Sequence, residues 1–341
     1  MFQPNFNYTT KMVNEMIEIQ SINDFILHSQ LILETEVSLK RDAVLKSAHH
    51  STAIEGNPLN MDQVEAIFKT MEKTAQKKAD QEVLNYLNVL QNLENYLENG
   101  KITENTILRL HEDITHYTLD YTYLEGQYRT VPVYIINSAG ETVFTPPHVN
   151  SIKNDMADLV DWINNVEELH PVIAAGIVHY EFVRIHPFVD GNGRTGRVLT
   201  AMYLHTSEFD MDRMFTLDEY YDKNRPSYYE ALNSVDQNTQ DMTQWLEYFI
   251  EGFKCSMREI KDQLLLILPE KSEKSRVKLS DKNRKILEHI HLNGTITNSE
   301  VQKLLKISRQ GAYKDLRYLM DKNIIEQRGG SRSTYYVLKG H

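Results

Sequence analysis

The sequence predicts a mainly α-helical protein that carries one β-hairpin in its central part and a small second domain at its C-terminal end. Glycine is scarce, with 14 in 341 residues, and the stretches between glycines and prolines carry apolar residues at helical spacing. The charge is divided as well, because residues 271–341 have a net charge of +9 and residues 1–270 one of −20. Such an asymmetry indicates two parts with different partners.

The composition excludes several classes of protein. Cys255 is the single cysteine, which rules out an internal disulfide and a cysteine-based zinc site. No stretch approaches the ~18 uninterrupted apolar residues of a membrane-spanning helix, so no membrane partner is expected. The first residues lack a basic region followed by an apolar run, so we expect no signal peptide and a cytoplasmic location.

Residues 1–110 are predicted to form an N-terminal helical region. Residues 11–54 contain neither glycine nor proline and carry apolar residues on one helical face. That helix is expected to end within residues 51–57, because a glycine there is soon followed by a proline. Further helices are predicted over residues 61–98 and from Thr103 onward.

The helical pattern is interrupted at residues 125–147, where β-branched and aromatic residues surround a turn. Pro132 argues against a central strand, so we predict an exposed or edge hairpin. Helices resume after it and continue to Leu268, and residues 111–268 are predicted to form one core. The charged, serine- and lysine-rich residues 269–278 have the composition of a linker.

Residues 279–341 are predicted to form a winged-helix domain. Three helical segments, at 281–292, 297–305 and 308–321, lead into two β-like runs joined by a Gly-Gly turn. The third segment is placed as a recognition helix, whose polar and basic side chains suit DNA: Arg309, Gln310, Tyr313, Lys314 and Arg317. The alternative is a winged helix that contacts protein or forms a homodimer, because the acidic remainder of the chain repels a duplex.

One twelve-residue segment concentrates groups suited to phosphate chemistry. Residues 186–197 read HPFVDGNGRTGR and hold three of the chain's 14 glycines within six positions. Gly191 and Gly193 stand at the expected start of a helix, where backbone N–H groups and the helix dipole favour an anion. Arg194 and Arg197 follow three residues apart on one face, and guanidinium groups bind phosphate oxygens well.

Two more side chains complete the predicted site. Asp190 is a hard oxygen ligand suited to Mg²⁺ between phosphates, and His186 can accept a proton from a nucleophile. Each element alone is more often structural: a Gly-x-Gly is usually a turn, a single histidine a core residue and an arginine pair a solvated face. Their combination within twelve residues favours chemistry on a nucleoside triphosphate.

The segment resembles the signature of the Fic family, H-x-F-x-[D/E]-G-N-G-R-x-x-R, and meets every defined position. The resemblance covers roughly residues 5–260 and implies a helical core with a β-hairpin "flap" beside the active site. It implies protein adenylylation, also called AMPylation: AMP passes from ATP to a Ser, Thr or Tyr hydroxyl of a target protein and pyrophosphate is released. The sequence does not reveal the target, and self-modification is one form that the reaction can take.

The resemblance assigns a role to each matching residue. His186 is the general base that deprotonates the target hydroxyl, and Asp190 holds Mg²⁺ against the α- and β-phosphates. Gly191, Asn192 and Gly193 cradle the α-phosphate and stabilise the charge that builds there.

The same resemblance implies that Arg194 contacts the β-phosphate and Arg197 the γ-phosphate. Tyr228 and Tyr229 either flank the adenine or belong to the core, since adjacent tyrosines on a helix serve either purpose. The flap strand is expected to hold the target segment by strand addition through Val133, Tyr134, Ile135 and Ile136.

Residues 51–57 read STAIEGN, which by itself is only a helix end with a surface carboxylate. Beside the motif it resembles the family's inhibitory helix, with Ser51 and Glu55 at positions i and i+4. The resemblance implies that Glu55 pairs with Arg197, occupies the γ-phosphate site from within the same chain and forces ATP into an unproductive pose. Some family members use this glutamate to remove AMP from the modified protein, and the sequence leaves that alternative open.

Two further interpretations remain. A Fic enzyme can transfer phosphate, phosphocholine or UMP instead, although the presence of Gly193 and Arg197 favours AMP over phosphate. The other is a winged-helix DNA-binding regulator whose Fic domain senses a nucleotide. The complete motif argues against a catalytically dead domain, but it is compatible with a dual role.

Overall fold

The computed structural model describes residues 2–29, 33–70, 75, 77–136, 140–207, 209, 214, 216–267, 280–322, 324–330 and 334–339. The predicted linker and the tip of the central hairpin, residues 137–139, lie outside the described residues. The chain divides into two compact units. One comprises Met1–Ser29 and Ala43–Gln263, and the other Gln30–Asp42 and Leu264–His341. The domain boundaries drawn from the sequence remain predictions.

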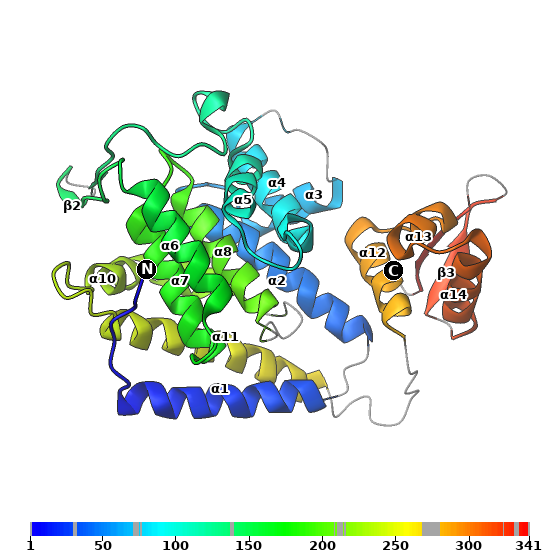
Figure 1. Cartoon of the computed structure of the whole chain (residues 1–341). Helices are drawn as coiled ribbons and strands as arrows, with labels where there is room; N and C mark the ends of the chain where they lie inside the picture. The colour runs from blue at the N-terminus through cyan, green and yellow to red at the C-terminus, as the bar shows by residue number, and fades with distance from the viewer. Residues whose placement is uncertain are drawn as a thin grey trace. The chain divides into compact units, whose positions relative to one another are not determined.

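The mainly helical architecture that the sequence predicts is confirmed (Figure 1). Among the described residues, no helix is long and apolar enough to cross a bilayer. Up to residue 267 the elements are α1 (Thr10–His28), α2 (Leu33–Ile54), α3 (Met61–Thr70), α4 (Lys78–Gln91), η1 (Leu93–Tyr96), α5 (Glu104–Thr115), η2 (Thr122–Leu124), β1 (Ile135–Ile136), β2 (Thr142–Phe144), α6 (Ile152–Asn165), α7 (Pro171–Ile185), α8 (Asn192–Thr206), α9 (Asp218–Lys223), α10 (Arg225–Asn233) and α11 (Thr243–Ile267).

Helix α7 provides much of the core of the first unit. Nearly all its side chains from Val172 to Ile185 are buried. Gly176 lets α11 come close, because a Cβ at this position would lie 2.9 Å from Leu246 Cδ2. The fully buried Trp245 donates its indole N–H to the Gly176 carbonyl at 2.8 Å, and removing such an aromatic side chain costs a fold about 3–5 kcal/mol. This packing makes α7 a rigid support for the loop that follows it.

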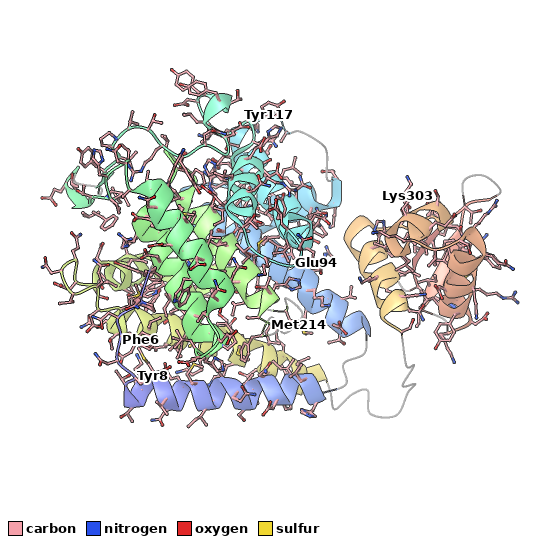
Figure 2. All side chains as sticks on the ribbon, in the orientation of Figure 1. Phe6, Tyr8, Glu94, Tyr117, Met214 and Lys303 are labelled. Carbon is pink, nitrogen blue, oxygen red and sulfur yellow. The ribbon has the colours of Figure 1, made fainter. Side chains whose placement is uncertain are left out.

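Helix α1 lies along α11 (Figure 1). Three ion pairs join the two helices: Lys11 with Glu251 at 2.7 Å, Glu15 with Lys254 at 2.7 Å and Glu18 with Arg258 at 2.6 Å. The residue numbers of the partners rise together, so the two helices run parallel. The segment before α1 carries Phe6 and Tyr8, whose rings meet edge to face with centroids 5.3 Å apart (Figure 2). The N-terminal segment is bonded to the residues before α11, since the Met242 N–H donates to the Asn5 carbonyl at 2.8 Å.

Strands β1 and β2 form the central hairpin that the sequence predicts. They pair antiparallel, with Ile135 opposite Phe144 and Ile136 opposite Thr142, and the register shifts between the two pairs. Tyr134, which precedes β1, is 61% exposed. The hairpin is thus a short, exposed two-stranded element, as expected from the proline three residues before it.

The second unit contains α12 (Asp281–Asn293), α13 (Asn298–Leu305), α14 (Arg309–Asp321), β3 (Ile325–Arg328) and β4 (Tyr335–Leu338). Strands β3 and β4 pair antiparallel in regular register. Ile296, between α12 and α13, joins the hairpin through two backbone hydrogen bonds with Tyr336, at 3.0 and 2.8 Å. The apolar faces of all three helices and of the hairpin share one buried cluster. The elements thus follow the order of the prediction.

Candidate active site

The loop between α7 and α8 is closed at both ends by left-handed backbone. His186 ends α7 with φ of 49°, and Gly191 precedes α8 with φ of 78°. A left-handed conformation is unusual for a non-glycine residue and costs on the order of 1–3 kcal/mol, so the surrounding structure must impose it on His186. At Gly191 a side chain has no room either, because a Cβ would lie 2.6 Å from Thr115 Cγ2.

The contacts of His186 leave one ring nitrogen free to act as a base. Its Nδ1 lies 3.3 Å from the Val183 carbonyl oxygen. A carbonyl only accepts hydrogen bonds, so Nδ1 carries the proton and Nε2 offers its lone pair. Burial of the ring lowers the pKa of His186 to about 4, and the nearby charge of Arg129 acts in the same direction. The imidazole is therefore neutral at pH 7, the form a general base needs.

Asn192 has a structural task that the sequence did not reveal. Its side chain Oδ1 accepts from the Phe188 N–H and its Nδ2 donates to the Phe188 carbonyl, both at 2.9 Å. These two bonds use the side-chain amide to tie the loop to the start of α8. One of the two N–H groups of Nδ2 is thus used within the loop, and the other and the backbone N–H of Asn192 are the groups left for a phosphate.

His111 supports the same loop from α5. Its ring stacks on Phe188, with centroids 3.6 Å apart, and its Nε2 lies 2.9 Å from the Asp190 carbonyl. Its Nδ1 accepts from the Gly126 N–H at 2.9 Å, so Nε2 is the protonated nitrogen and donates to Asp190. Burial lowers the pKa of His111 to about 4 and keeps this tautomer neutral. No motif in the sequence marks this histidine.

The start of α8 presents unpaired backbone donors. The first N–H that bonds along the helix is that of Thr195, which donates to the Gly191 carbonyl at 3.0 Å. The N–H groups of Asn192, Gly193 and Arg194 precede it and have no partner within the helix. Such donors and the helix dipole favour an anion at this point, and the anion site predicted from the sequence stays a prediction.

Arg194 is buried with part of its guanidinium unsatisfied. The residue is 3% exposed, and its Nε and Nη1 have no hydrogen-bond partner among the described residues. Two carboxylates lie at longer range, Glu82 Oε1 at 3.6 Å from Nη1 and Asp190 Oδ1 at 3.8 Å from Nη2. A buried cation whose N–H donors lack hydrogen-bond partners costs folding free energy, and a phosphate oxygen would accept hydrogen bonds from these donors. Glu82, on α4, was not identified from the sequence.

Arg197 is held by both residues of the predicted inhibitory helix. Its Nη2 donates to Glu55 Oε1 at 2.8 Å and to the Ser51 carbonyl at 2.9 Å, and its Nε donates to Ser51 Oγ at 2.6 Å. Although burial opposes the charge, Glu55 and Asp218 help to hold the pKa of Arg197 above its ordinary value. The structure therefore brings Arg197 together with two residues that lie more than 140 positions before it in the chain.

The Glu55 carboxylate also covers the start of α8. A Cβ built on Gly193 would collide with Glu55 Oε1 and would lie 3.0 Å from Arg197 Nη1. Only glycine permits this approach, and it brings a negative charge to the point where the helix amides converge. One carboxylate thus contacts two of the groups that suit a phosphate.

Further contacts fasten the C-terminal half of α2. Three polar pairs join it to the region of α9: Lys46 with Glu219 at 2.8 Å, Ser47 with Asp218 at 2.5 Å and His50 with Asp222 at 2.7 Å. Beyond the helix, Asn57 Nδ2 donates to Glu82 Oε2 and to the Ala79 carbonyl, both at 2.9 Å. Glu55 is therefore presented by a segment anchored on both sides.

Asp190 is the only motif residue with a carboxylate, which makes it the candidate ligand for Mg²⁺. Its side chain is 58% exposed, and its Oδ1 accepts from the Gly191 N–H at 2.5 Å. Within the described residues no group of three or more His, Cys, Asp or Glu could hold a metal by itself. Mg²⁺ often binds through one or two carboxylates, several waters and substrate phosphates, so a single exposed carboxylate beside the anion site fits this mode.

The structure separates the two tyrosines. Tyr228 is 2% exposed, its hydroxyl lies 2.9 Å from His179 Nε2 and its ring stacks on Tyr221, so its burial favours the core alternative over contact with adenine. Tyr229 is 43% exposed. Burial raises the pKa of Tyr229, and Glu55 and Arg197 also act on it, which puts this phenol near the site.

The four flap residues do not share one environment. Val133 and Ile135 are half-buried, Tyr134 is exposed, and the side chain of Ile136 lies outside the described residues. The nearby Arg129 was missed by the sequence analysis. It is 3% exposed and donates from Nε to the His186 carbonyl at 2.8 Å. Because its acceptors are main-chain carbonyls, no charge pattern in the sequence could reveal it.

The fold and the site define a helical protein with a glycine-containing loop between two core helices, a flanking hairpin and a carboxylate, that of Glu55, against the start of the second helix. Residues 101–204 match the model of the Fic/DOC family, so this segment of the chain is similar to a Fic domain. A Fic family protein from Desulfovibrio desulfuricans G20 has a similar fold, with a TM-score of 0.67 and 25% identity over 100% of this chain and 99% of that one. Fic-1 from Caenorhabditis elegans gives a TM-score of 0.60 at 23% identity over 75% of this chain and 73% of that one, which supports the fold alone.

Among curated proteins, the chain is similar to the protein adenylyltransferase Fic of Nematostella vectensis. The two are 28% identical over 64% of this chain and 48% of that relative. Protein adenylyltransferase fic-1 of C. elegans is 26% identical over 78% of this chain and 52% of its own length. The chain thus spans about half the length of the curated relatives it matches.

Proposed function

We propose that this protein is an adenylyltransferase that moves AMP from ATP to a Ser, Thr or Tyr hydroxyl of a protein. The observation that carries the proposal is the neutral His186, which lies six residues before the first of the backbone N–H groups at the start of α8 and close in sequence to Arg194, whose Nε and Nη1 have no hydrogen-bond partner among the described residues. A base beside a preformed anion site is what nucleotidyl transfer to a hydroxyl requires. The names of the similar proteins support this choice.

In the proposed reaction, His186 Nε2 removes the proton of the target hydroxyl. The hydroxyl oxygen then attacks the α-phosphorus of ATP, and pyrophosphate leaves. The backbone amides at the start of α8 stabilise the negative charge on the α-phosphate, and Arg194 and Arg197 bind the β- and γ-phosphates. Mg²⁺, held by Asp190 and the phosphates, would neutralise charge on the leaving group.

Tyr229 is proposed to face the adenine from α10, because its ring is partly exposed and lies within electrostatic range of Glu55 and Arg197. The hairpin is proposed to present the target by adding a strand of the target protein to β1 or β2. Each of these strands pairs on one side with the other, and the free edge offers backbone hydrogen bonds.

We also propose that Glu55 inhibits transfer from within the chain. It is bonded to Arg197 and lies against Gly193, so it competes with a phosphate for both groups. ATP can still bind through Arg194, but its γ-phosphate cannot bind Arg197 while Glu55 does. The α-phosphate is then displaced from the attacking hydroxyl. The competing bond is charge-assisted, which makes it an effective rival for a phosphate oxygen.

The transferred group is tested with ATP labelled at the α- or the γ-phosphate. Incubation of the Glu55→Gly protein with a cell lysate should label proteins from α-labelled ATP only, and His186→Ala should remove the label. Label from γ-labelled ATP alone would identify a kinase-like transfer instead. Mass spectrometry of the labelled bands would then give the target and the acceptor residue, and would show whether the protein modifies itself.

A second candidate function concerns the C-terminal unit, which we propose is a winged helix that binds DNA. Helix α14 is capped by Ser308, whose side chain accepts from the Gly311 N–H. Its outer face exposes polar and basic side chains: Arg309, Gln310, Tyr313, Lys314 and Arg317. This face and its place after α13 suit insertion into a major groove.

DNA binding is tested on the full chain with a triple substitution of Arg309, Lys314 and Arg317 by Gln. The wild type should shift a duplex at low salt, with an affinity that falls as salt rises, and the variant should lose most of this binding and flatten the salt slope. No shift by the wild type at low salt would favour a protein-binding surface. An oligomer that depends on these residues would favour the homodimer.

A further inference from the structure

Arg129 is a buried arginine whose partners are main-chain carbonyls. The residue is 3% exposed, and no ion pair involving it occurs within the described part of the chain. Burial lowers the pKa of Arg129, although an arginine remains charged at neutral pH. A buried charge of this kind is tolerated only where other groups satisfy its donors, so its contacts indicate what it holds.

The contacts of Arg129 converge on the catalytic loop. Its Nε donates to the His186 carbonyl at 2.8 Å, and its Nη2 lies 3.5 Å from the Ile185 carbonyl. Its backbone N–H donates to the Pro187 carbonyl at 2.8 Å. One residue thus bonds three consecutive carbonyls around His186, the residue with the left-handed backbone.

The remaining contacts of Arg129 reach both ends of the hairpin segment. Its Nη2 donates to the Pro147 carbonyl at 2.7 Å, three residues after β2, and its Nη1 lies 3.4 Å from the Val131 carbonyl, four residues before β1. The guanidinium is therefore the point at which the entry to the hairpin, its exit and the catalytic loop meet.

We propose that Arg129 is a positioning residue that couples the flap to the catalytic histidine, so that a target hydroxyl held on the hairpin meets His186 Nε2 at a fixed distance. This inference rests on the proposed AMP transfer and names a residue that this transfer needs. The coupling is direct, because the same planar guanidinium fixes the His186 peptide and both ends of the hairpin. Lysine cannot replace it, since a single ammonium cannot reach acceptors in so many directions.

Arg129 also acts on the charge state of His186. Burial accounts for most of the lowered pKa of His186, and Arg129 lowers it further, whereas Glu55 and Asp190 raise it. Within the described part of the chain, these three are the charged groups that act on the imidazole. Removing the charge of Arg129 should therefore raise the pKa of His186 and leave a smaller fraction of the base unprotonated in mildly acidic buffer.

The test compares Arg129→Met and Arg129→Lys in the full chain, without nucleotide. We expect the His186 ring to titrate at higher pH in Arg129→Met by NMR, and the amides of residues 142–144 to exchange hydrogen faster. Arg129→Lys keeps the charge and should leave the titration near that of the wild type while exchange at the hairpin is still faster. Arg184→Met is the matched control. Arg184 lies two residues before His186, but its charge is paired with Glu181 at 2.6 Å.

Activity is measured in the Glu55→Gly background. Arg129→Met should lower kcat for transfer about 100-fold, the loss expected from a misplaced reacting group, and should leave the KM for ATP within about twofold. An unchanged His186 titration together with unchanged hairpin exchange in Arg129→Met would overturn the inference. If Arg129→Met does not fold, Arg129→Lys takes its place, and unchanged hydrogen exchange at the hairpin amides of Arg129→Lys would overturn the inference. If the His186 titration and the hairpin exchange change as expected while no variant transfers AMP, the proposed function is wrong, but the coupling of the hairpin to His186 through Arg129 is supported.

Discussion

Glu55 Oε1 lies 2.8 Å from Arg197 Nη2 and against the Cα of Gly193, so one carboxylate from α2 contacts the guanidinium and the helix start together. Neither contact involves the target or the base His186. The proposed inhibition by Glu55 therefore acts on the way in which the nucleotide binds. Substitutions that weaken these two contacts should change the affinity for the nucleotide, which can be measured without any transfer.

The first prediction is that Glu55→Gly strengthens the binding of ATP more than that of ADP. Only ATP carries the γ-phosphate that Arg197 would receive. We expect about a tenfold gain in ATP affinity, as for one charge-assisted hydrogen bond regained, and less than a threefold gain for ADP. Calorimetric titration of both nucleotides checks this. Equal gains for ATP and ADP would show that Glu55 does not occupy the γ-phosphate site.

A second prediction concerns the anchor beyond the helix. Asn57→Ala removes the hydrogen bonds to Glu82 and to the Ala79 carbonyl, which hold the chain directly after Glu55. The segment should then release Glu55 part of the time, and self-modification should rise about threefold, less than in Glu55→Gly. Asn60→Ala is a suitable control because its side chain bonds locally, to the Gln63 N–H. Identical rates in Asn57→Ala and wild type would remove this segment from the inhibitory mechanism.

The third prediction is the pH dependence of transfer. His186 acts in its unprotonated form, and burial lowers its pKa from 6.5 to about 4. In the Glu55→Gly protein, the rate should be nearly constant between pH 8 and about pH 5.5 and should fall tenfold per unit only below the lowered pKa. The rate is measured by initial-velocity transfer at saturating ATP. A pH–rate profile that begins to fall near pH 6.5, the ordinary pKa of histidine, would contradict the proposal that the base is buried and neutral.

Stability should also depend on pH, through buried histidines. Burial lowers the pKa of His179 to about 3 and that of His111 to about 4, so the unfolded chain binds protons that the folded one rejects. The contribution is complete above the unfolded value of about 6.5, and the free energy of unfolding should fall as pH drops from there toward 4, by up to ~1.4 kcal/mol per pH unit for each histidine.

Urea unfolding at pH 7 and pH 5 measures this slope. His179→Gln should reduce the dependence of the free energy of unfolding on pH by about the contribution of one histidine. The exposed His28 is a matched control, whose replacement should leave this dependence unchanged. A free energy of unfolding that rises toward pH 5 would show that the buried histidines do not control acid stability.

Most of the fold and the centre of the site were predictable from local sequence. Gly191, Gly193 and the two arginines form a contiguous pattern whose geometry follows from the start of a helix, and the structure places them there. The pairing of Ser51 and Glu55 with Arg197 was predictable only through the family resemblance, since no local pattern links segments so far apart in the chain.

Other residues gave no signal because their partners are distant or are main-chain atoms. Arg129 bonds the carbonyl of a residue 57 positions away, and His111 bonds the carbonyl of a residue 79 positions away. Asn192 lies in the motif, yet its side chain serves the loop itself. Tyr228 shows the opposite case, in which tertiary packing places one of two adjacent tyrosines in the core.

The central claim is that the site transfers AMP through His186 and that Glu55 holds this reaction off. The most direct measurement is the rate of self-labelling from α-labelled ATP by wild type, Glu55→Gly and the Glu55→Gly, His186→Ala double variant. The account predicts a low rate for wild type, at least about a tenfold increase for Glu55→Gly, and a fall of at least about 100-fold from that level when His186 is also removed. Equal labelling by wild type and Glu55→Gly, or full labelling by the double variant, would contradict it.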